Sequence, residues 1–133
     1  MATFDFLIEY AQKVNLGFRQ EKLSRAPLTQ KKYEDYKQEC GNLHEHIMKT
    51  YLKNNDYCIS LNMFPLDLQK NISHYVLWIK NGVDLDIYQY IQSCFGNKRF
   101  VIFTNPKEWK SIPTVIHHHI FVEEYYQKCV SGK

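Results

Sequence analysis

The stretch from Phe103 to Val122 constrains the fold of this chain more than any other part of it. Aromatic and β-branched residues, which favour strands, occupy both of its ends. The loop between the ends contains two prolines, and proline cannot donate a hydrogen bond to a sheet ladder. The pattern therefore predicts that one strand ends at Phe103 and that another runs over residues 115–122.

The preceding sequence predicts the neighbours of these strands. Residues 74–80 are rich in β-branched and aromatic side chains at both odd-numbered and even-numbered positions, which indicates a strand buried on both faces. Residues 84–95 have helical spacing, and residues 99–103 again favour a strand. We expect residues 58–61 to be either a short strand or an extended link. Residues 64–68 suggest a turn that opens a short helical segment.

Two helices are predicted in the N-terminal part of the chain. Apolar residues recur at three- and four-residue steps over residues 3–15, and Thr3 is a suitable N-cap. A longer apolar stripe predicts a second helix over residues 30–53, with Thr29 as its N-cap. Gly41 lies within this stripe, where glycine costs about 1 kcal/mol. We expect the helix to continue through it.

The length of 133 residues fits one domain. We expect an N-terminal helix and linker over residues 1–28, in which Pro27 stops any continuing helix. A long amphipathic helix follows over residues 29–54, and the sheet and the candidate site lie in residues 55–133. The predicted fold class is α+β, with N-terminal helices packed on a small antiparallel sheet that contains one inserted helix.

Charge and cysteine usage limit the classes of partner. The net charge is +3 and the basic residues are scattered, which argues against a nucleic-acid groove. No apolar run approaches the roughly 20 residues that cross a bilayer, so no membrane association is expected. The four cysteines form no C-x-x-C pair and follow no signal peptide, which predicts reduced thiols in an intracellular protein, cytoplasmic or nuclear. No cofactor is expected.

Three consecutive histidines lie in the last predicted strand. Side chains alternate between the faces of a strand, so His117, His119 and Phe121 share one face, with the first two about 7 Å apart at Cα. Two imidazoles on one face can bind a phosphate or transfer a proton, and His117 and His119 are therefore the candidate catalytic residues. His118 lies on the opposite face, where we expect a buried, hydrogen-bonded histidine.

Further polar residues are candidates for ligand binding. The loop before the histidine strand carries lysine, serine and asparagine side chains that suit an anion, and a tryptophan, Trp109, that suits a base or sugar. The predicted ligand-binding residues are His74, Trp78, Asn105, Lys110 and Ser111.

Two other chemistries remain open from the residues alone. A zinc ion bound by His117 and His119 would need His74 or a cysteine as a further ligand, but the spacings of structural zinc sites are absent. We therefore assign no metal. A cysteine and a histidine could also form a nucleophilic pair in space, although no local signature marks any of the four thiols.

Several blocks of the sequence match a known family. They are Arg25-Ala26-Pro27 with Tyr33, Phe64-Pro65, Ile72 to Trp78, Thr104-Asn105-Pro106, Lys110 to Pro113, and His117-x-His119. In order and spacing these blocks resemble the fungal N-acetylglucosamine-induced protein 1-like family, also called DUF3605, over about residues 25–122. The family has no established activity, so the resemblance implies a shared fold and site. His118 departs from its pattern, which has an apolar residue there.

The C-terminal part is also similar to the HIT superfamily of nucleotide hydrolases and transferases. Those enzymes end with a His-x-His-x-His strand, which follows a strand bearing an asparagine. The similarity implies that His117 matches the nucleophile that attacks the α-phosphate and that His119 matches the last histidine. The first histidine position falls on Val115, or on Thr114 with a shift of one residue, so the triad is incomplete.

The sequence thus supports two functions of different classes. The first is a histidine-lined pocket that binds or hydrolyses a phosphorylated small molecule, such as a nucleotide or sugar phosphate. The second is a non-enzymatic interaction with a protein partner or a second copy of the chain. In this second function the N-terminal helix or exposed aromatic residues, among them Trp109, Tyr125 and Tyr126, make the contact.

Overall fold

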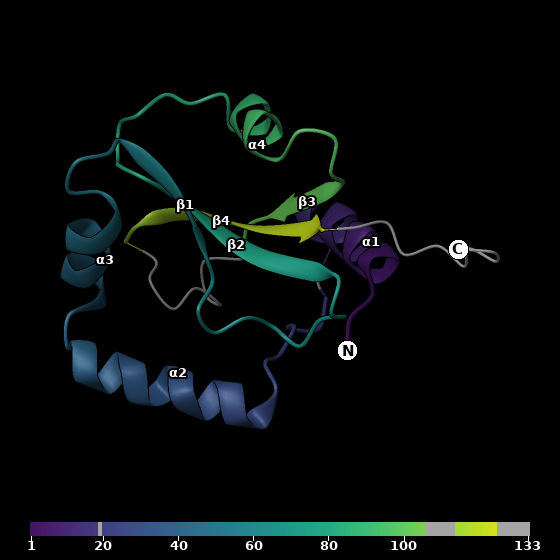
Figure 1. Cartoon of the computed structure of the whole chain (residues 1–133), viewed down its shortest axis with the longest axis horizontal. Helices are drawn as coiled ribbons and strands as arrows, with labels where there is room; N and C mark the ends of the chain where they lie inside the picture. The colour runs from purple at the N-terminus through teal and green to yellow at the C-terminus, as the bar shows by residue number, and fades with distance from the viewer. Residues whose placement is uncertain (19, 106–113, 125–133) are drawn as a thin grey trace.

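The computed structural model describes residues 1–18, 20–105 and 114–124 (Figure 1). Helices and strands follow one another in the order α1 (Phe4–Asn15), α2 (Pro27–Cys40), α3 (Leu43–Tyr51), β1 (Tyr57–Leu61), β2 (Ile72–Ile79), α4 (Ile87–Phe95), β3 (Phe100–Phe103) and β4 (Ile116–Glu123). The predicted α+β class and the inserted helix are confirmed. Within the described residues no helix is both long and apolar enough to cross a bilayer.

The four strands form one antiparallel sheet in the order β1-β2-β4-β3. The two central strands are β2, which was predicted to be buried on both faces, and the histidine strand β4. Leu77 of β2 lies opposite His118 of β4, and Trp78 lies opposite His117. This register brings the odd-numbered histidines of β4 beside the even-numbered residues of β2, on one face of the sheet.

Helices cover both faces of this sheet (Figure 1). On one face α1 and α3 enclose two buried clusters, whose members include Phe4, Leu7, Tyr10, Phe103, Phe121, Ile47, Leu52 and Trp78. On the other face α4 covers a third cluster, which consists of Leu77, Ile79, Ile91, Ile120 and Val122. The first face is the one that carries the candidate site.

The long second helix predicted from the sequence is wrong. The chain forms two helices, α2 and α3, which meet at Gly41 with φ 71° and ψ −102°. This conformation is the mirror image of extended backbone, which only glycine adopts readily. Glycine therefore ends α2 here, and Asn42 caps α3 by accepting a hydrogen bond from the amide of Glu45 at 3.1 Å.

The start of α2 also differs from the prediction. Ala26 is the N-cap and Pro27 is the first helical residue, whereas Thr29 lies inside the first turn. Proline is favourable at this position because its missing amide proton would have no helical partner. Pro27 thus begins a helix, where the sequence analysis took it as a stop. In contrast, the predicted Thr3 cap of α1 is confirmed by a 3.1 Å bond from the amide of Phe6.

Residues 64–68 contain no helix. They belong to the connection between β1 and β2, in which Leu68 makes an isolated parallel bridge with Ala2. The aromatic ring of Phe64 holds this connection against α2, with ring centroids 5.5 Å from Tyr33 and 5.1 Å from Tyr36. Because none of the residues of α2 is buried, these ring contacts are important for positioning that helix.

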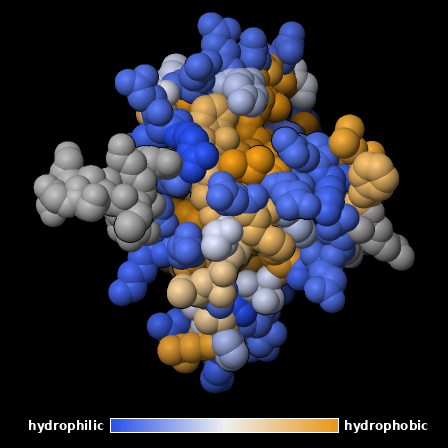
Figure 2. Space-filling view, turned by 90° about the vertical axis from the view of Figure 1, so that its right-hand side faces the viewer, coloured by the Kyte–Doolittle hydropathy of each residue, from blue (hydrophilic) through white to orange (hydrophobic). Residues whose placement is uncertain are grey.

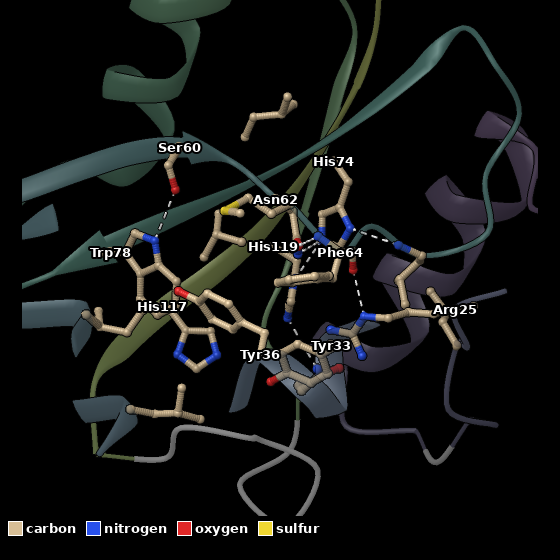
Figure 3. Close-up of a pocket in the computed structure, with 18 of the residues that line it drawn as sticks. Arg25, Tyr33, Tyr36, Ser60, Asn62, Phe64, His74, Trp78, His117 and His119 are labelled. Carbon is tan, nitrogen blue, oxygen red and sulfur yellow. Dashed lines mark hydrogen bonds between the residues drawn. The ribbon is translucent and has the colours of Figure 1, made fainter. Parts of the chain in front are cut away.

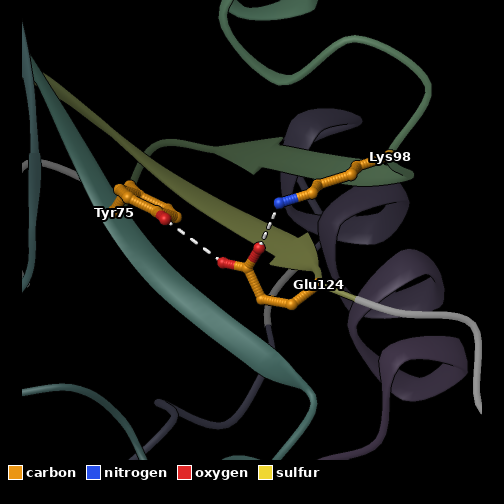
Figure 4. Close-up of polar contacts among 3 residues, drawn as sticks. All are labelled: Tyr75, Lys98 and Glu124. Carbon is orange, nitrogen blue, oxygen red and sulfur yellow. Dashed lines mark hydrogen bonds and ion pairs between the residues drawn. The ribbon is translucent and has the colours of Figure 1, made fainter.

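Polar and charged side chains form hydrogen bonds around the C-terminal end of β4 (Figure 4). The carboxylate of Glu124 accepts a 2.6 Å bond from Lys98 Nζ and a 3.1 Å bond from the hydroxyl of Tyr75. Arg99 donates two hydrogen bonds to Glu123, at 2.8 and 2.9 Å. Two adjacent carboxylates therefore link the end of β4 to the residues just before β3 and to Tyr75 within β2.

Candidate functional site

A pocket of about 130 Å³ lies on the first face of the sheet. Its floor is formed by β2 and β4, and its walls by α2, α3, the connection between β1 and β2, and the linker before α2. Figure 3 shows Arg25 at one end of this pocket and Trp78 with His117 at the other end, with His119 between them. Segments distant in sequence thus enclose one cavity.

Five predicted site residues line this pocket. They are His74, Trp78, Asn105, His117 and His119. The strand register explains why four of them meet, because the pairing of β2 with β4 places His74, Trp78, His117 and His119 on the same face. Asn105 joins them because it lies two residues after the end of β3, the strand that pairs with β4. Lys110 and Ser111, predicted to bind an anion, lie outside the described residues, as do Lys107 and Trp109.

His74 is part of the pocket wall and is only 2% exposed. Its Nδ1 accepts a 3.3 Å hydrogen bond from the amide of Leu66, and its Nε2 lies 2.9 Å from Nδ1 of His119. Burial lowers the pKa of His74 well below its ordinary value, and the nearby His119 and Arg25 lower it further. His74 is therefore neutral at neutral pH.

His119 continues the contact toward the end of β3. Its Nε2 lies 3.3 Å from the side-chain amide nitrogen of Asn105, and its ring stacks on Phe103 with centroids 5.4 Å apart. Since His119 is less buried than His74, it is the member of this pair that a ligand in the pocket can contact.

His117 is held by its own strand and by aromatic neighbours. Its Nδ1 donates to the carbonyl oxygen of Val115 at 2.8 Å, so the neutral ring carries its lone pair on Nε2. The ring packs 5.2 Å from that of Trp78, which stacks on Tyr51 and donates to Ser60 Oγ at 3.2 Å. This environment fixes the orientation of a ring that can accept a proton at Nε2.

Arg25 is a pocket residue that the sequence analysis did not identify as such. Its Nε donates to the carbonyl oxygen of Phe64 at 2.6 Å, its Nη1 to Gln30 at 3.3 Å, and its guanidinium lies 4.0 Å from the centre of the Tyr33 ring. Burial lowers the pKa of Arg25, and Tyr33 opposes this shift, but a guanidinium stays charged in proteins. In the described part of the chain no carboxylate forms an ion pair with it.

The place of Arg25 in the pocket could not be predicted from the sequence, although the residue belongs to a block that stood out there. The Arg-Ala-Pro block carried part of the family resemblance, yet it gave no reason to place the arginine near the histidines. That placement depends on the connection between β1 and β2, whose Phe64 carbonyl receives the guanidinium. A contact over 39 residues leaves no local pattern.

His118 lies on the opposite face, as predicted, and shares a hydrogen bond with Thr104 Oγ1. It is half-buried at the edge of that face, less buried than expected. The two histidines of α3 also lie outside the pocket: His46 contacts the hydroxyl of Tyr36, and His44 contacts Thr114 Oγ1 at 2.8 Å.

A zinc site gains no support from this geometry. The described residues include no group of three histidine, cysteine or acidic side chains that could hold a metal ion. The physical reason is visible in the pocket, where His74 and His119 direct ring nitrogens at each other across 2.9 Å. Nitrogens that share a hydrogen bond are not both available to a metal.

Comparisons with known proteins agree with part of the sequence analysis. The model of a family described as "Protein of unknown function (DUF3605)" matches residues 11–123. The crystal structure of a protein called HTC1 is similar with a TM-score of 0.69 and 16% identity, over 92% of this chain and 85% of that chain. At this identity the likeness shows a shared fold alone. No curated protein matches, and none of these findings supports the resemblance to the HIT superfamily.

Proposed function

We propose that this chain, which belongs to the DUF3605 family, binds a small phosphorylated molecule in the pocket lined by His117, His119 and Arg25. The observation that carries the proposal is the half-buried guanidinium of Arg25, which has no carboxylate partner in the described residues. A partly buried charge is costly unless a counter-charge accompanies it. An anionic ligand would supply that charge.

The other lining residues fit an anion with an organic part. None of the described lining residues is acidic, whereas Lys22 is a second cation at the rim. Tyr33, Tyr36 and Phe64 provide an aromatic wall beside Arg25. Guanidinium groups bind phosphate through paired hydrogen bonds, and the Nη2 of Arg25 has no hydrogen-bond partner in the described residues.

The volume of the pocket restricts the size of the ligand. Pockets for drug-sized molecules measure about 300–1,000 Å³, and a cavity near 150 Å³ holds one benzene ring. A pocket of about 130 Å³ therefore takes a phosphate with at most one small ring. This favours a sugar phosphate over a complete nucleotide, whose base would extend beyond the pocket.

The proposal is tested by thermal melting with inorganic phosphate, hexose phosphates, nucleoside monophosphates and divalent metals. A ligand present at 100 times its dissociation constant should add about 2.7 kcal/mol of stability. We expect stabilisation by phosphates, weaker at high salt, and its loss in Arg25→Met. Arg25→Lys, which keeps a charge but not the paired donors, should retain a part. A phosphate response that Arg25→Met leaves intact would refute the assignment.

An enzymatic form of the function, hydrolysis of a phosphate monoester, would use the two histidines. The Nε2 lone pair of His117 attacks phosphorus as the ester P–O bond breaks, and the leaving oxygen takes a proton from His119 in its protonated form. Water then cleaves the new P–N bond, which releases phosphate, restores neutral His117 and returns a proton to His119. This form is supported by the fixed lone pair of His117. Release of inorganic phosphate should be absent in His117→Asn, a variant chosen because its amide can still donate to Val115. Equal release by wild type and variant would exclude the role.

Binding of a protein partner is the second candidate function. It is favoured by three apolar side chains around α1, Phe6, Leu16 and Phe18, which are 48%, 75% and 63% exposed. On the face seen in Figure 2, apolar side chains gather at the centre between hydrophilic ones. Sedimentation of the wild type and of Leu16→Ser/Phe18→Ser separates the cases: a dimer that the substitutions dissociate supports this function, and a concentration-independent monomer opposes self-association.

A further inference from the structure

A chain of hydrogen-bonding groups crosses the pocket wall from a backbone amide to a side-chain amide. It begins at the amide of Leu66, passes through the rings of His74 and His119, and ends at Asn105, with distances of 3.3, 2.9 and 3.3 Å. Each ring in this chain uses both of its nitrogens. The protonation of the first ring therefore dictates that of the second.

The backbone amide determines the tautomer of His74. The N–H of Leu66 can only donate, so the Nδ1 of His74 must be the acceptor. A neutral imidazole carries a single proton, which in His74 then lies on Nε2. This N–H points to His119 and makes Nδ1 of His119 an acceptor in turn.

In the competing arrangement the hydrogen bonds run in the opposite direction, with His119 as the donor and His74 as the acceptor. It would place the proton of His74 on Nδ1 and let Nε2 accept from His119 and from the amide of Asn62, which lies 3.5 Å away. That arrangement leaves the N–H of Leu66 facing another donor, and leaving a partly buried amide unpaired is costly. The Asn62 oxygen accepts from the amide of Phe64 at 2.8 Å, so the Asn62 amino group faces Nε2 of His74 and suits this arrangement. At 3.5 Å, however, that contact is longer and weaker than the 3.3 Å bond from Leu66. The direction from Leu66 toward Asn105 is thus the favourable one.

The same donor-to-acceptor direction continues through His119 to Asn105, the last group in the row of hydrogen bonds. With its lone pair on Nδ1, His119 carries its ring proton on Nε2, which faces Asn105. To accept this proton, Asn105 must present its side-chain oxygen to His119. The oxygen and nitrogen of an asparagine amide are assigned from such networks. The amino group of Asn105 then forms the other side of the amide in the pocket lining.

We propose that His74 is a positioning residue, which fixes His119 as a donor at Nε2 and turns the amino group of Asn105 toward an anionic oxygen of the ligand. This inference rests on the proposed phosphate-binding function and extends it. Arg25 supplies charge at one end of the pocket, while Asn105 supplies an oriented donor. His117 presents a lone pair, so the two odd-numbered histidines of β4 have opposite hydrogen-bonding roles.

The ring nitrogens that carry the protons, and with them the donor-to-acceptor direction of these hydrogen bonds, can be measured without a ligand. In a long-range ¹H–¹⁵N correlation spectrum, a ring nitrogen with a proton is distinguished from one with a lone pair. We expect His74 and His119 both to carry the proton on Nε2, and His117 to carry it on Nδ1. A proton on Nδ1 of His119 would overturn the inference, whatever the protein binds.

Binding of inorganic phosphate to variants tests the positioning role. His74→Phe keeps a ring but no hydrogen bond, and we expect about a tenfold or greater loss of phosphate affinity, as for one hydrogen bond to a charged group. His74→Gln keeps an acceptor and a donor in one amide and should bind within about threefold of the wild type. Equal affinity of His74→Phe and wild type would overturn the role.

The two proposals fail in different ways. Absence of phosphate binding in the wild type would overturn the proposed function and the ligand part of this inference, while the ring tautomers would still decide the direction of the chain. Loss of phosphate binding in Arg25→Met with unchanged tautomers would support both. If His74→Phe does not fold, the wild-type spectrum and the His74→Gln titration remain decisive, and a His74→Gln protein that binds more than tenfold more weakly contradicts the rescue.

Discussion

At the scale of single residues, the pocket wall depends on a histidine that remains neutral. His74 is surrounded by protein and accepts a hydrogen bond from a backbone amide, so a second proton would be both desolvated and directed at a donor. In the unfolded chain the same side chain is solvated and takes up a proton below its ordinary pKa of about 6.5. Folding therefore releases a proton from His74 in mildly acidic solution.

This difference predicts how stability depends on pH. Because the pKa of His74 is lowered in the folded state, its contribution is complete above pH 6.5 and is lost as pH falls toward the folded-state value. The loss reaches about 1.4 kcal/mol per pH unit for one group. Urea unfolding between pH 7.5 and 5.5 should show this slope in the wild type and in His44→Gln, which removes an exposed histidine. His74→Gln should show a smaller slope, and an unchanged one would contradict the prediction.

Glu124 should produce the same trend at lower pH. Burial tends to raise the pKa of its carboxyl group, but hydrogen bonds from Lys98, Ser73 and Tyr75 outweigh burial and lower it. The stabilisation is therefore present above the ordinary pKa of a glutamate and is lost as pH falls through the lowered value. Glu124→Gln should melt at a slightly lower temperature at pH 7 and equal the wild type in strong acid. A deficit that persists in acid would instead indicate a packing defect.

At the scale of elements, Gly41 determines how the helices reach the pocket. An uninterrupted helix would carry Tyr33 and Tyr51 in one straight stripe. The break instead lets α2 contact Phe64 while α3 contacts the sheet, so that Tyr51 stacks on Trp78. The walls of the pocket therefore depend on one backbone conformation.

Replacement of Gly41 should show this dependence. The space around it is open, since a Cβ would meet no atom within 4 Å, so any cost comes from the backbone alone. We expect Gly41→Ala and Gly41→Asn each to lose about 1–3 kcal/mol in urea unfolding. Asparagine is the informative control because it tolerates left-handed helical backbone but not this conformation. A neutral Gly41→Asn would show that the turn adopts another geometry.

Local sequence patterns predicted the helices and strands better than they predicted the contacts between distant segments. Alternation in the 115–122 stretch placed His117 and His119 on one face and His118 on the other, and helical spacing predicted α1 with its Thr3 cap. The spacing that merged α2 with α3 failed because an apolar stripe persists across a break that only the backbone of Gly41 reveals. Positions such as that of Arg25 were beyond prediction because they depend on contacts between distant segments.

At the scale of the whole molecule, the pocket joins parts of the chain that are otherwise separate. The linker before α2 contributes Arg25, which donates to Phe64 in the connection between β1 and β2, and that connection contributes Leu66 to the histidine chain. A phosphate held between Arg25 and Asn105 would thus restrain both segments against the sheet. In contrast, α4 covers the opposite face and shares no lining residue with the pocket.

Hydrogen exchange should therefore respond to phosphate on one face of the molecule. Amides of residues 20–26 and 62–66 should exchange more slowly by up to about 100-fold with phosphate at 100 times its dissociation constant, if they open only when phosphate has left. Amides of α4 provide the internal control, because their local opening does not require the ligand to leave. Arg25→Met should remove the protection of both segments together, since the bound phosphate is the link between them. Equal slowing in α4 would mean that phosphate stabilises the whole fold and not this pocket, and slowing confined to α4 would place the anion on the other face of the sheet.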